Sequence, residues 1–561
     1  MKTVLVIGGG ISGLVSAINL KNKGYKVILV EKNRDLGGRL YQQKFGDYII
    51  NNGPSWYWMP SIINSVYHTL GIKEKDIYNL VKLDPQFKII FDKEEFDIPG
   101  EYEDIKILFK NLDTKSDKNL DTFMENSKYK YQKGFSKFIF YPNLLINEYL
   151  EPKLLYYIYK FNIFQSYRSL CQKISNNSYI QKLVEWPALF IGSNPKNITG
   201  LYSLLSYSMF KEGTYIPTKK GMIEIIDLLT KYCYKNKITI IKETEVVDFI
   251  FTANKITKVK IKTNENINNL IDVKVDYVMN SADYFHIEHL LPNKFRSYPL
   301  SYWDKLVVCP SCLLFSITLN TKLDKLQFHN LFFKGSLDNH TNHIYNYGTL
   351  PKEPLFYLNI TTKLFNEAPE GEENLFILIP SNPDIVLSSC EIKRVYKYVI
   401  KEISLASKVN IENHIINKRI FKDKSFGNKF NSFKFNAYGL GCDKFQNIFI
   451  RPKLKSLYVE NLYFCGQTTS PGPGIAPCMI SGLNSSNLLY KDDIEENKSY
   501  IPQKYGTIIY YLSKYKYIFF RLVTHFITLI CIIGFNRDLY FGMKREYNYL
   551  VNKKFTKSNS F

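Results

Sequence analysis

The sequence has no regular arrangement of cysteines. Its nine cysteines are scattered over 561 residues, and Cys309-Pro-Ser-Cys312 is a CxxC pair without a second such pair. This excludes the disulfide framework of a small secreted domain and favours free thiols in a reducing compartment. Two closely spaced histidine pairs, 286/289 and 340/343, lack the cysteine or carboxylate neighbours of a zinc site. We therefore expect no bound metal.

The motifs of hydrolytic catalysis are also absent. The sequence contains no recognisable Ser-His-Asp order, no HExxH and no pair of carboxylates whose spacing calls for general acid–base work. This argues against a serine hydrolase or a zinc protease. It also leaves the catalytic residues unassigned, because no side chain is singled out as a base.

Long basic runs are missing in spite of a high net charge. Lys and Arg number 74 against 52 Asp and Glu, which gives +22, but no run of five or six basic residues occurs. We therefore expect no nucleic-acid binding and retain a membrane lipid surface as the partner of this excess charge. With 45% hydrophobic and 22% charged residues, the composition is that of a globular protein.

The N-terminal apolar run, Val4–Ile7, is too short for a signal peptide, so we expect the protein to face the cytoplasm. The same run predicts a buried parallel strand, and Gly8, Gly10 and Gly13 follow it as G-x-G-x-x-G before apolar residues at helical spacing. In this motif the first glycine permits a tight turn, the second lets the backbone approach a pyrophosphate, and the third lets the helix pack on the strand. The motif predicts a dinucleotide site at the helix N-terminus.

A second apolar run, Val27–Val30, ends at Glu31. A carboxylate about twenty residues after the glycine motif can accept hydrogen bonds from ribose hydroxyls. Gly37-Gly38-Arg39 follows, where a second glycine turn can approach the phosphates and Arg39 can neutralise them. This arrangement favours FAD over NAD.

Further motifs accompany this site along the chain: Gly46-Asp47-Tyr48, Asn51-Asn52-Gly53-Pro54, Glu245-Val246-Val247, Asn461–Gly466, Pro471–Gly474 and Ser481-Gly482. In content and order they resemble the amine-oxidase superfamily of flavoproteins. More closely, they resemble its phytoene desaturase branch, the bacterial and fungal type of carotenoid desaturase.

The resemblance implies an α/β fold with a Rossmann-like FAD-binding domain built from three segments, 1–90, 212–300 and 436–490. Segments 91–211 and 301–435 would form a substrate-binding domain of mixed sheet and helices. The cofactor-binding residues implied by the resemblance are Gly8, Gly10, Gly13, Glu31, Gly38, Arg39, Gly53, Val246, Gly466, Gly474 and Met479.

The implied reaction is the FAD-dependent desaturation of a long apolar isoprenoid such as phytoene. Flavin N5 would accept a hydride, and a quinone or oxygen would reoxidise the flavin. A polyene saturase or cis–trans isomerase of the same fold, an amine oxidase and a catalytically inactive membrane flavoprotein stay open as alternatives. Three departures from the family pattern bear on the last of these: Asn51 in place of Asp, Lys219-Lys220 in place of a glycine-rich turn, and Ala476-Pro477 in place of Pro-Gly.

The tail, 491–561, contains an apolar segment, Tyr517–Phe535. Four polar residues in it share one helical face, at spacings i, i+3, i+4 and i+7: Arg521, Thr524, His525 and Thr528. The stretch between Arg521 and Arg537 is shorter than the roughly 20 residues that a spanning helix needs. We expect a hydrophobic C-terminal helix that lies in the membrane interface, with a buried helix of a soluble domain as the alternative.

Overall fold

The computed structural model describes residues 1–136, 138–140, 154–263, 270–421, 423–442, 446 and 451–496. Residues Met1–Asp493 form one compact unit. In this described part of the chain, no helix has both the length and the apolar character needed to cross a bilayer. The segment Tyr517–Phe535, for which we expect an interfacial helix, lies outside the described residues.

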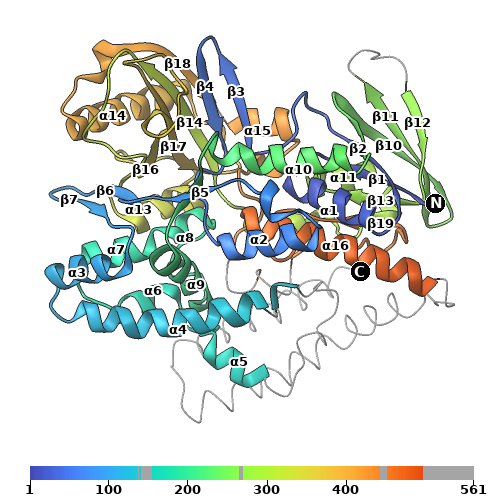
Figure 1. Cartoon of the computed structure of the whole chain (residues 1–561), viewed down its shortest axis with the longest axis horizontal. Helices are drawn as coiled ribbons and strands as arrows, with labels where there is room; N and C mark the ends of the chain where they lie inside the picture. The colour runs from blue at the N-terminus through green and yellow to red at the C-terminus, as the bar shows by residue number, and fades with distance from the viewer. Residues whose placement is uncertain are drawn as a thin grey trace, which may run out of the picture. The chain divides into compact units, whose positions relative to one another are not determined.

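The glycine motif belongs to a five-stranded parallel sheet of order β19-β13-β1-β2-β9 (Figure 1). In β1 (Thr3–Ile7), Val4 lies opposite Val27 of β2 (Lys26–Val30) and Tyr277 of β13 (Tyr277–Asn280). The outer strands are β9 (Thr239–Ile241) and β19 (Leu462–Phe464). Segments from the beginning, middle and end of the chain thus meet in one sheet, which confirms the predicted α/β fold.

Helices cover one face of this sheet, and a small antiparallel sheet covers the other. Because side chains alternate along a strand, Val4 and Val6 pack with α1 (Ile11–Asn22), α10 (Glu224–Lys235) and α16 (Ile475–Glu496). Leu5 and Ile7 pack with β10 (Thr244–Thr252), β11 (Lys255–Thr263) and α11 (Tyr284–Leu290), and β12 (Leu270–Lys274) extends the small sheet. A strand segment buried on both faces is apolar throughout, as Val4–Ile7 of β1 is.

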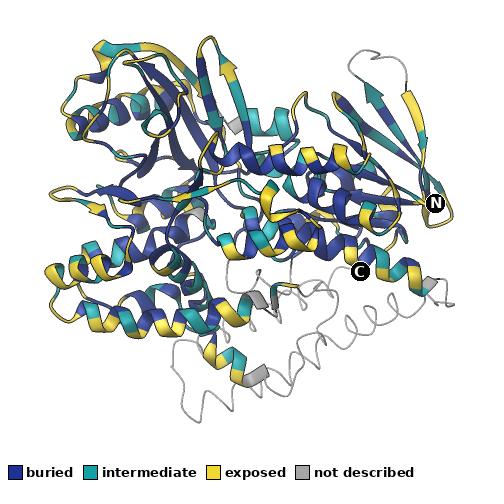
Figure 2. Cartoon of the chain, in the orientation of Figure 1, coloured by how far each residue is buried: buried dark blue, intermediate teal, exposed yellow. Residues whose placement is uncertain are grey.

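A second, mixed sheet has seven strands in the order β18-β14-β17-β16-β15-β6-β7. Their bounds are Ile415–Phe421 (β18), Ser311–Leu319 (β14), Glu373–Ser381 (β17), Phe356–Ile360 (β16), His329–Phe332 (β15), Phe87–Ile90 (β6) and Glu95–Ile98 (β7). Helix α14 (Ser389–Ser407) packs on one face, and α3 (Tyr102–Leu112), α4 (Ser116–Ser136) and α7 (Ser178–Glu185) pack on the other. The inner strands of both sheets are largely buried, whereas the edge strands β7, β9 and β18 are partly exposed (Figure 2). Since β6 already belongs to this sheet, the chain enters it before the expected boundary at residue 90.

The remaining strands form two short antiparallel pairs, β3 (Tyr41–Phe45) with β4 (Tyr48–Asn52) and β5 (Leu80–Lys82) with β8 (Tyr215–Pro217). The remaining helices are α2 (Pro60–Thr69), α5 (Leu154–Lys160), α6 (Tyr167–Cys171), α8 (Pro187–Phe190), α9 (Ser203–Tyr207), α12 (Leu300–Trp303), α13 (Leu337–Asn342) and α15 (Asp423–Phe430).

Candidate cofactor and substrate site

The turn from β1 to α1 is built so that only glycine fits at two of its positions. Gly8 has φ +94°, and a Cβ on it would lie 2.9 Å from the backbone nitrogen of Ala282. A Cβ on Gly13 would lie 2.0 Å from the carbonyl oxygen of Gly8, so the close packing of α1 on β1 requires glycine there. Gly10 is different, because a Cβ on it would meet no atom within 4 Å. The backbone at Gly10 therefore borders open space at a helix N-terminus, which fits a cofactor diphosphate.

Glu31 follows the end of β2 and is 5% exposed. Its Oε2 accepts a hydrogen bond from the N–H of Gly9 at 2.7 Å, and its Oε1 accepts from the N–H and the Nδ2 of Asn33, both at 2.8 Å. A carboxylate offers about four acceptor positions, so these three donors leave one of them for a ligand. This arrangement suits a ribose hydroxyl.

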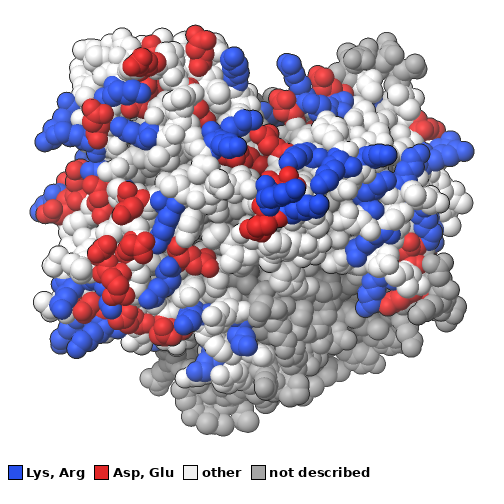
Figure 3. Space-filling view, viewed as in Figure 1, with Lys and Arg blue, Asp and Glu red and all other residues white. Residues whose placement is uncertain are grey.

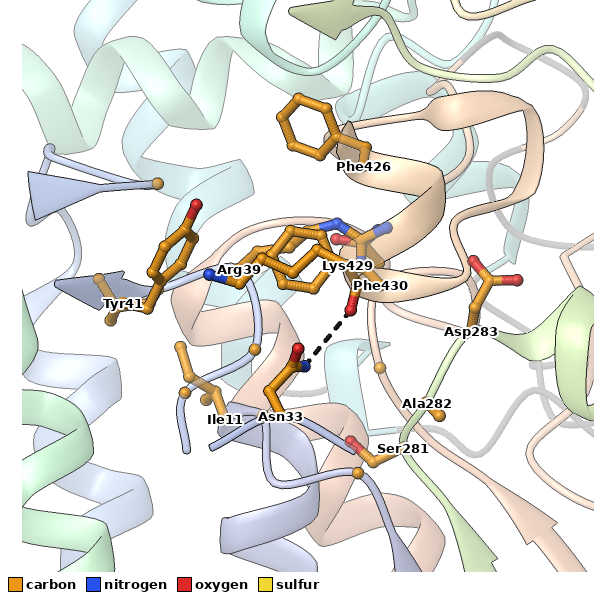
Figure 4. A pocket seen from close by; sticks show the side chains of 18 of the residues that line it. Ile11, Asn33, Arg39, Tyr41, Ser281, Ala282, Asp283, Phe426, Lys429 and Phe430 are labelled. Atoms are coloured by element: carbon orange, nitrogen blue, oxygen red, sulfur yellow. Dashed lines mark hydrogen bonds between the residues drawn. The ribbon is translucent and has the colours of Figure 1, made fainter. Parts of the chain in front are cut away.

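Arg39 extends from the second glycine turn along the cavity wall (Figure 4). Its Nη2 donates to Ser432 Oγ at 2.8 Å and to the carbonyl oxygen of Asn436 at 3.3 Å. Burial lowers the pKa of Arg39, and the nearby carboxyl of Asp283 opposes this shift. Within the described residues its buried Nε has no hydrogen-bond partner. A buried donor is costly to leave unpaired, so Arg39 fits a phosphate oxygen of a bound dinucleotide.

One cavity gathers nine of the eleven residues implied by the resemblance: Gly8, Gly10, Glu31, Gly38, Arg39, Gly53, Val246, Gly466 and Gly474. Gly13 and Met479 do not line it. Gly13 lies behind Gly8, and Met479 is fully buried in the apolar core beside α16. These two residues act through packing and do not border the cavity.

Two glycines in the segment between β19 and α16 also line the cavity. Gly466 and Gly474 have φ values of +113° and +117°, a region that residues with a Cβ rarely adopt. The N–H of Gly466 donates to Ser481 Oγ at 3.0 Å, so this amide is not directed into the cavity. Pro477 lies in the first turn of α16, where its missing N–H breaks no helical hydrogen bond.

The departure at Asn51 has a structural reason. The side-chain nitrogen of Asn51 donates to both carboxylate oxygens of Glu367, at 2.7 and 2.6 Å. An aspartate at position 51 would face this carboxylate with a like charge. In the same way, the backbone N–H groups of Lys219 and Lys220 both donate to Glu224 Oε1 at 2.8 Å, which orders the turn without further glycines.

Helix α15 contributes cavity residues that the sequence reasoning missed. Lys429 Nζ lies 3.2 Å from the centroid of the Tyr41 ring, and the Lys429 carbonyl accepts from Asn33 Nδ2 at 3.3 Å (Figure 4). Burial lowers the pKa of Lys429 to about 8. Phe426 and Phe430 line the cavity from the same helix. No local motif marks this helix, so only the tertiary packing of α15 reveals these residues.

Part of the cavity lining is an apolar sheet face. It is formed by Cys312 and Leu314 of β14, Phe376 and Leu378 of β17, and Phe421 of β18. These residues occupy one face of the seven-stranded sheet because they are spaced by two along their strands, and Leu314 lies opposite both Leu378 and Phe421. The glycine-rich turns and an apolar sheet face therefore border one continuous space.

The comparisons with known proteins agree with this geometry. The family described as flavin containing amine oxidoreductase matches residues 11–489. A carotenoid 3,4-desaturase of Haloarcula japonica is 27% identical over 494 residues, which cover 87% of this chain and 98% of the relative. A 1-hydroxycarotenoid 3,4-desaturase of a Flavobacterium is 25% identical over 494 residues, covering 87% and 99%. A 4,4'-diapophytoene desaturase of Staphylococcus aureus is 24% identical over 505 residues, also covering 87% and 99%.

Solved structures share the fold at lower identity. Putrescine oxidase bound to putrescine aligns with a TM-score of 0.55 at 12% identity, covering 88% of this chain and 99% of that one. An oxidoreductase from Methanosarcina mazei aligns with a TM-score of 0.54 at 13% identity, covering 86% and 100%. The family match extends over most of the chain and confirms the resemblance seen in the motifs. This chain therefore belongs to the flavin-containing amine oxidoreductase family, and it is an oxidoreductase whose cofactor is FAD.

Proposed function

We propose that this protein desaturates a long apolar polyene of the carotenoid type. The observation that carries the proposal is the single cavity in which the dinucleotide turn at Gly10 and Arg39 meets the apolar sheet face at Leu314 and Phe376. The names of the relatives, which are desaturases of carotenoids and of diapophytoene aligned over nearly their full length, support it.

In this proposal a CH–CH unit next to a conjugated chain loses a hydride and a proton, and a C=C bond forms. When bound, FAD would supply the two-electron acceptor, with N5 as the acceptor of the hydride, and the proton would complete the reduced form FADH2. The C–H bonds concerned are not acidic, so positioning matters more than a strong base. Glu31 and Arg39 would hold the dinucleotide, and Leu314, Phe376 and Leu378 would hold the polyene and exclude water.

We further propose that segments 1–90, 212–300 and 436–490 bind FAD, apart from β6, which belongs to the seven-stranded sheet, while segments 91–211 and 301–435 bind the polyene. Phytoene is the substrate we propose first. A quinone or oxygen would accept the electrons, and a bilayer would supply the substrate to a protein on its cytoplasmic face. The cavity wall supports an apolar substrate, because its side chains Phe376 and Leu378 are apolar and are only 4% and 6% exposed to solvent.

The experiment incubates full-length, FAD-loaded protein with phytoene in phosphatidylcholine vesicles and a quinone. We expect products that are lighter by two hydrogens for each step and absorb at longer wavelength. Leu314→Trp should narrow the cavity and lower the rate at least about tenfold while the flavin content stays normal, because small displacements from a reactive geometry are costly. Ile420→Trp is the matched control, since Ile420 is 39% exposed and lies outside the cavity lining. Equal rates in both variants, or oxidation of amines without any polyene product, would contradict the proposal.

A further inference from the structure

A second cavity, of about 310 Å³, lies among helices α4, α5 and α6 and shares no lining residue with the FAD cavity. Three lysines line it: Lys130 of α4, Lys160 of α5, and Lys173 just after α6. Amide side chains, among them Asn126 and Asn162, supply most of the remaining polar lining. No Asp or Glu is found among the lining residues that the structure describes. The charged residues of the described lining are thus all basic.

Lys130 is the most deeply buried of the three lysines, with only 1% of its surface exposed. Its Nζ donates to the carbonyl oxygen of Gly200 and to Ser203 Oγ, both at 2.9 Å. In the described part of the chain no carboxylate forms an ion pair with it. Burial lowers the pKa of Lys130 to about 7, and the positive charge of Lys173 acts in the same direction. A buried ammonium without a counter-ion is unfavourable, so an anion in this cavity would stabilise its charged form.

The other two lysines are also without carboxylate partners in the described residues. This is unlike the neighbouring helix α3, where Lys106 pairs with Asp121 at 2.9 Å and Lys110 approaches Asp117 to 3.8 Å. On the face shown in Figure 3, Lys and Arg side chains are interspersed with Asp and Glu side chains. The carboxylate-free lysines of the cavity depart from this mixed pattern. They give the cavity lining a local positive charge.

Exposed aromatic rings occur on the chain segments that line the cavity. Tyr159 lines the cavity and is 68% exposed, while Tyr156 and Phe164 nearby are 49% and 54% exposed. Lys160 Nζ lies 5.8 Å from the centroid of the Tyr156 ring. Aromatic rings next to lysines are typical of surfaces that rest in the headgroup layer of a bilayer, where rings are partly desolvated and ammonium groups meet phosphates. The rim therefore favours a lipid headgroup over free phosphate.

We propose that this cavity binds the phosphate of an anionic phospholipid, with Lys130, Lys160 and Lys173 as its cationic contacts. The rings of Tyr156 and Tyr159 lie in the headgroup layer beside it. This contact would hold helices α4 and α5 against the bilayer.

The test compares full-length wild type, Lys160→Glu/Lys173→Glu, and Lys397→Glu/Lys401→Glu. The last pair, exposed lysines of α14 outside the cavity, makes the same change in net charge. Binding is measured by co-sedimentation with vesicles of phosphatidylcholine alone and of phosphatidylcholine with phosphatidic acid. For each protein, the partition coefficient on the phosphatidic acid vesicles is divided by that on the phosphatidylcholine vesicles. This ratio cancels any membrane binding by residues 491–561 that does not depend on lipid charge. We expect this ratio to fall at least about fivefold in the cavity variant relative to the α14 variant, since two lysine contacts with the anionic surface are replaced by two repelled carboxylates.

Equal ratios in the two variants would overturn the proposal, because net charge alone would then explain the binding. A calorimetric titration with inorganic phosphate distinguishes the source of the anion. In one outcome the wild type binds phosphate saturably, the cavity variant does not, and the two variants have the same vesicle ratio. This outcome would show a free-phosphate site and would also overturn the lipid assignment. Normal flavin content in each variant establishes that the fold is intact.

Discussion

Gly10→Val separates cofactor binding from folding at the β1–α1 turn. Gly10 has φ −74° and ψ 177°, a conformation open to any residue, and its Cβ position is free of atoms within 4 Å. The polypeptide fold should therefore accept a side chain at this position. A change of this kind from glycine at a permitted conformation stabilises the unliganded protein by about 0.4–1 kcal/mol.

The same valine occupies the space in which we place the cofactor diphosphate. Each hydrogen bond from a backbone N–H to a charged phosphate contributes about 1.5–3 kcal/mol. The loss of two such bonds amounts to about 3–6 kcal/mol, which weakens FAD binding at least about a hundredfold. Gly13→Ala should instead destabilise the fold. Its Cβ would lie 2.0 Å from the carbonyl oxygen of Gly8 and 3.1 Å from Ser281 Cβ, so it should destabilise the fold by about 1–3 kcal/mol or more.

The assay measures flavin absorbance per protein after gel filtration, together with the thermal unfolding midpoint of the flavin-free protein. We expect Gly10→Val protein to unfold at or above the wild-type midpoint and to retain almost no flavin. We expect Gly13→Ala protein to unfold at a lower temperature. Wild-type flavin content in folded Gly10→Val protein would falsify the placement of the diphosphate.

Three further changes test other parts of the account. Glu31→Ala should weaken FAD binding by about 1.5–3 kcal/mol through the loss of a charged acceptor, and unchanged flavin fluorescence titrations would count against that role. Gly474→Leu puts a side chain at φ +117°, 3.2 Å from Pro477 Cδ, and should reduce turnover by a larger factor than it reduces the unfolding midpoint; wild-type turnover would refute this. Burial raises the pKa of Glu288 to about 7, so the folded state holds its proton longer than the unfolded state does. Wild-type stability should thus fall by about 3 kcal/mol as pH rises from 4.5 through 7, and parallel pH curves for Glu288→Gln and wild type would contradict this.

The dinucleotide half of the site could be predicted from the sequence because its signals are local. Gly8, Gly10 and Glu31 stand at fixed distances along one strand-turn-helix-strand unit, and that unit sets their positions in space. Gly466 and Gly474 lie far along the chain and could be placed only through the family resemblance.

The residues that were missed depend on packing between distant segments. Lys429 and Phe430 reach the cavity because α15 packs next to the second sheet, and no periodicity in residues 423–430 indicates this. Lys130 is similar, since a lysine within a polar helix is expected to be solvated. It is buried only because Gly200 and Ser203 approach its ammonium group from another part of the chain.

The central claim, that electrons pass from a polyene to FAD, is tested most directly by the absorption spectrum of the purified protein under anaerobic conditions, before and after addition of phytoene. The account predicts that the oxidised-flavin bands bleach while the bands of a more conjugated polyene appear at longer wavelength, one double bond for each flavin reduced. A flavin that stays oxidised with phytoene, in protein whose flavin dithionite reduces normally, would contradict the account.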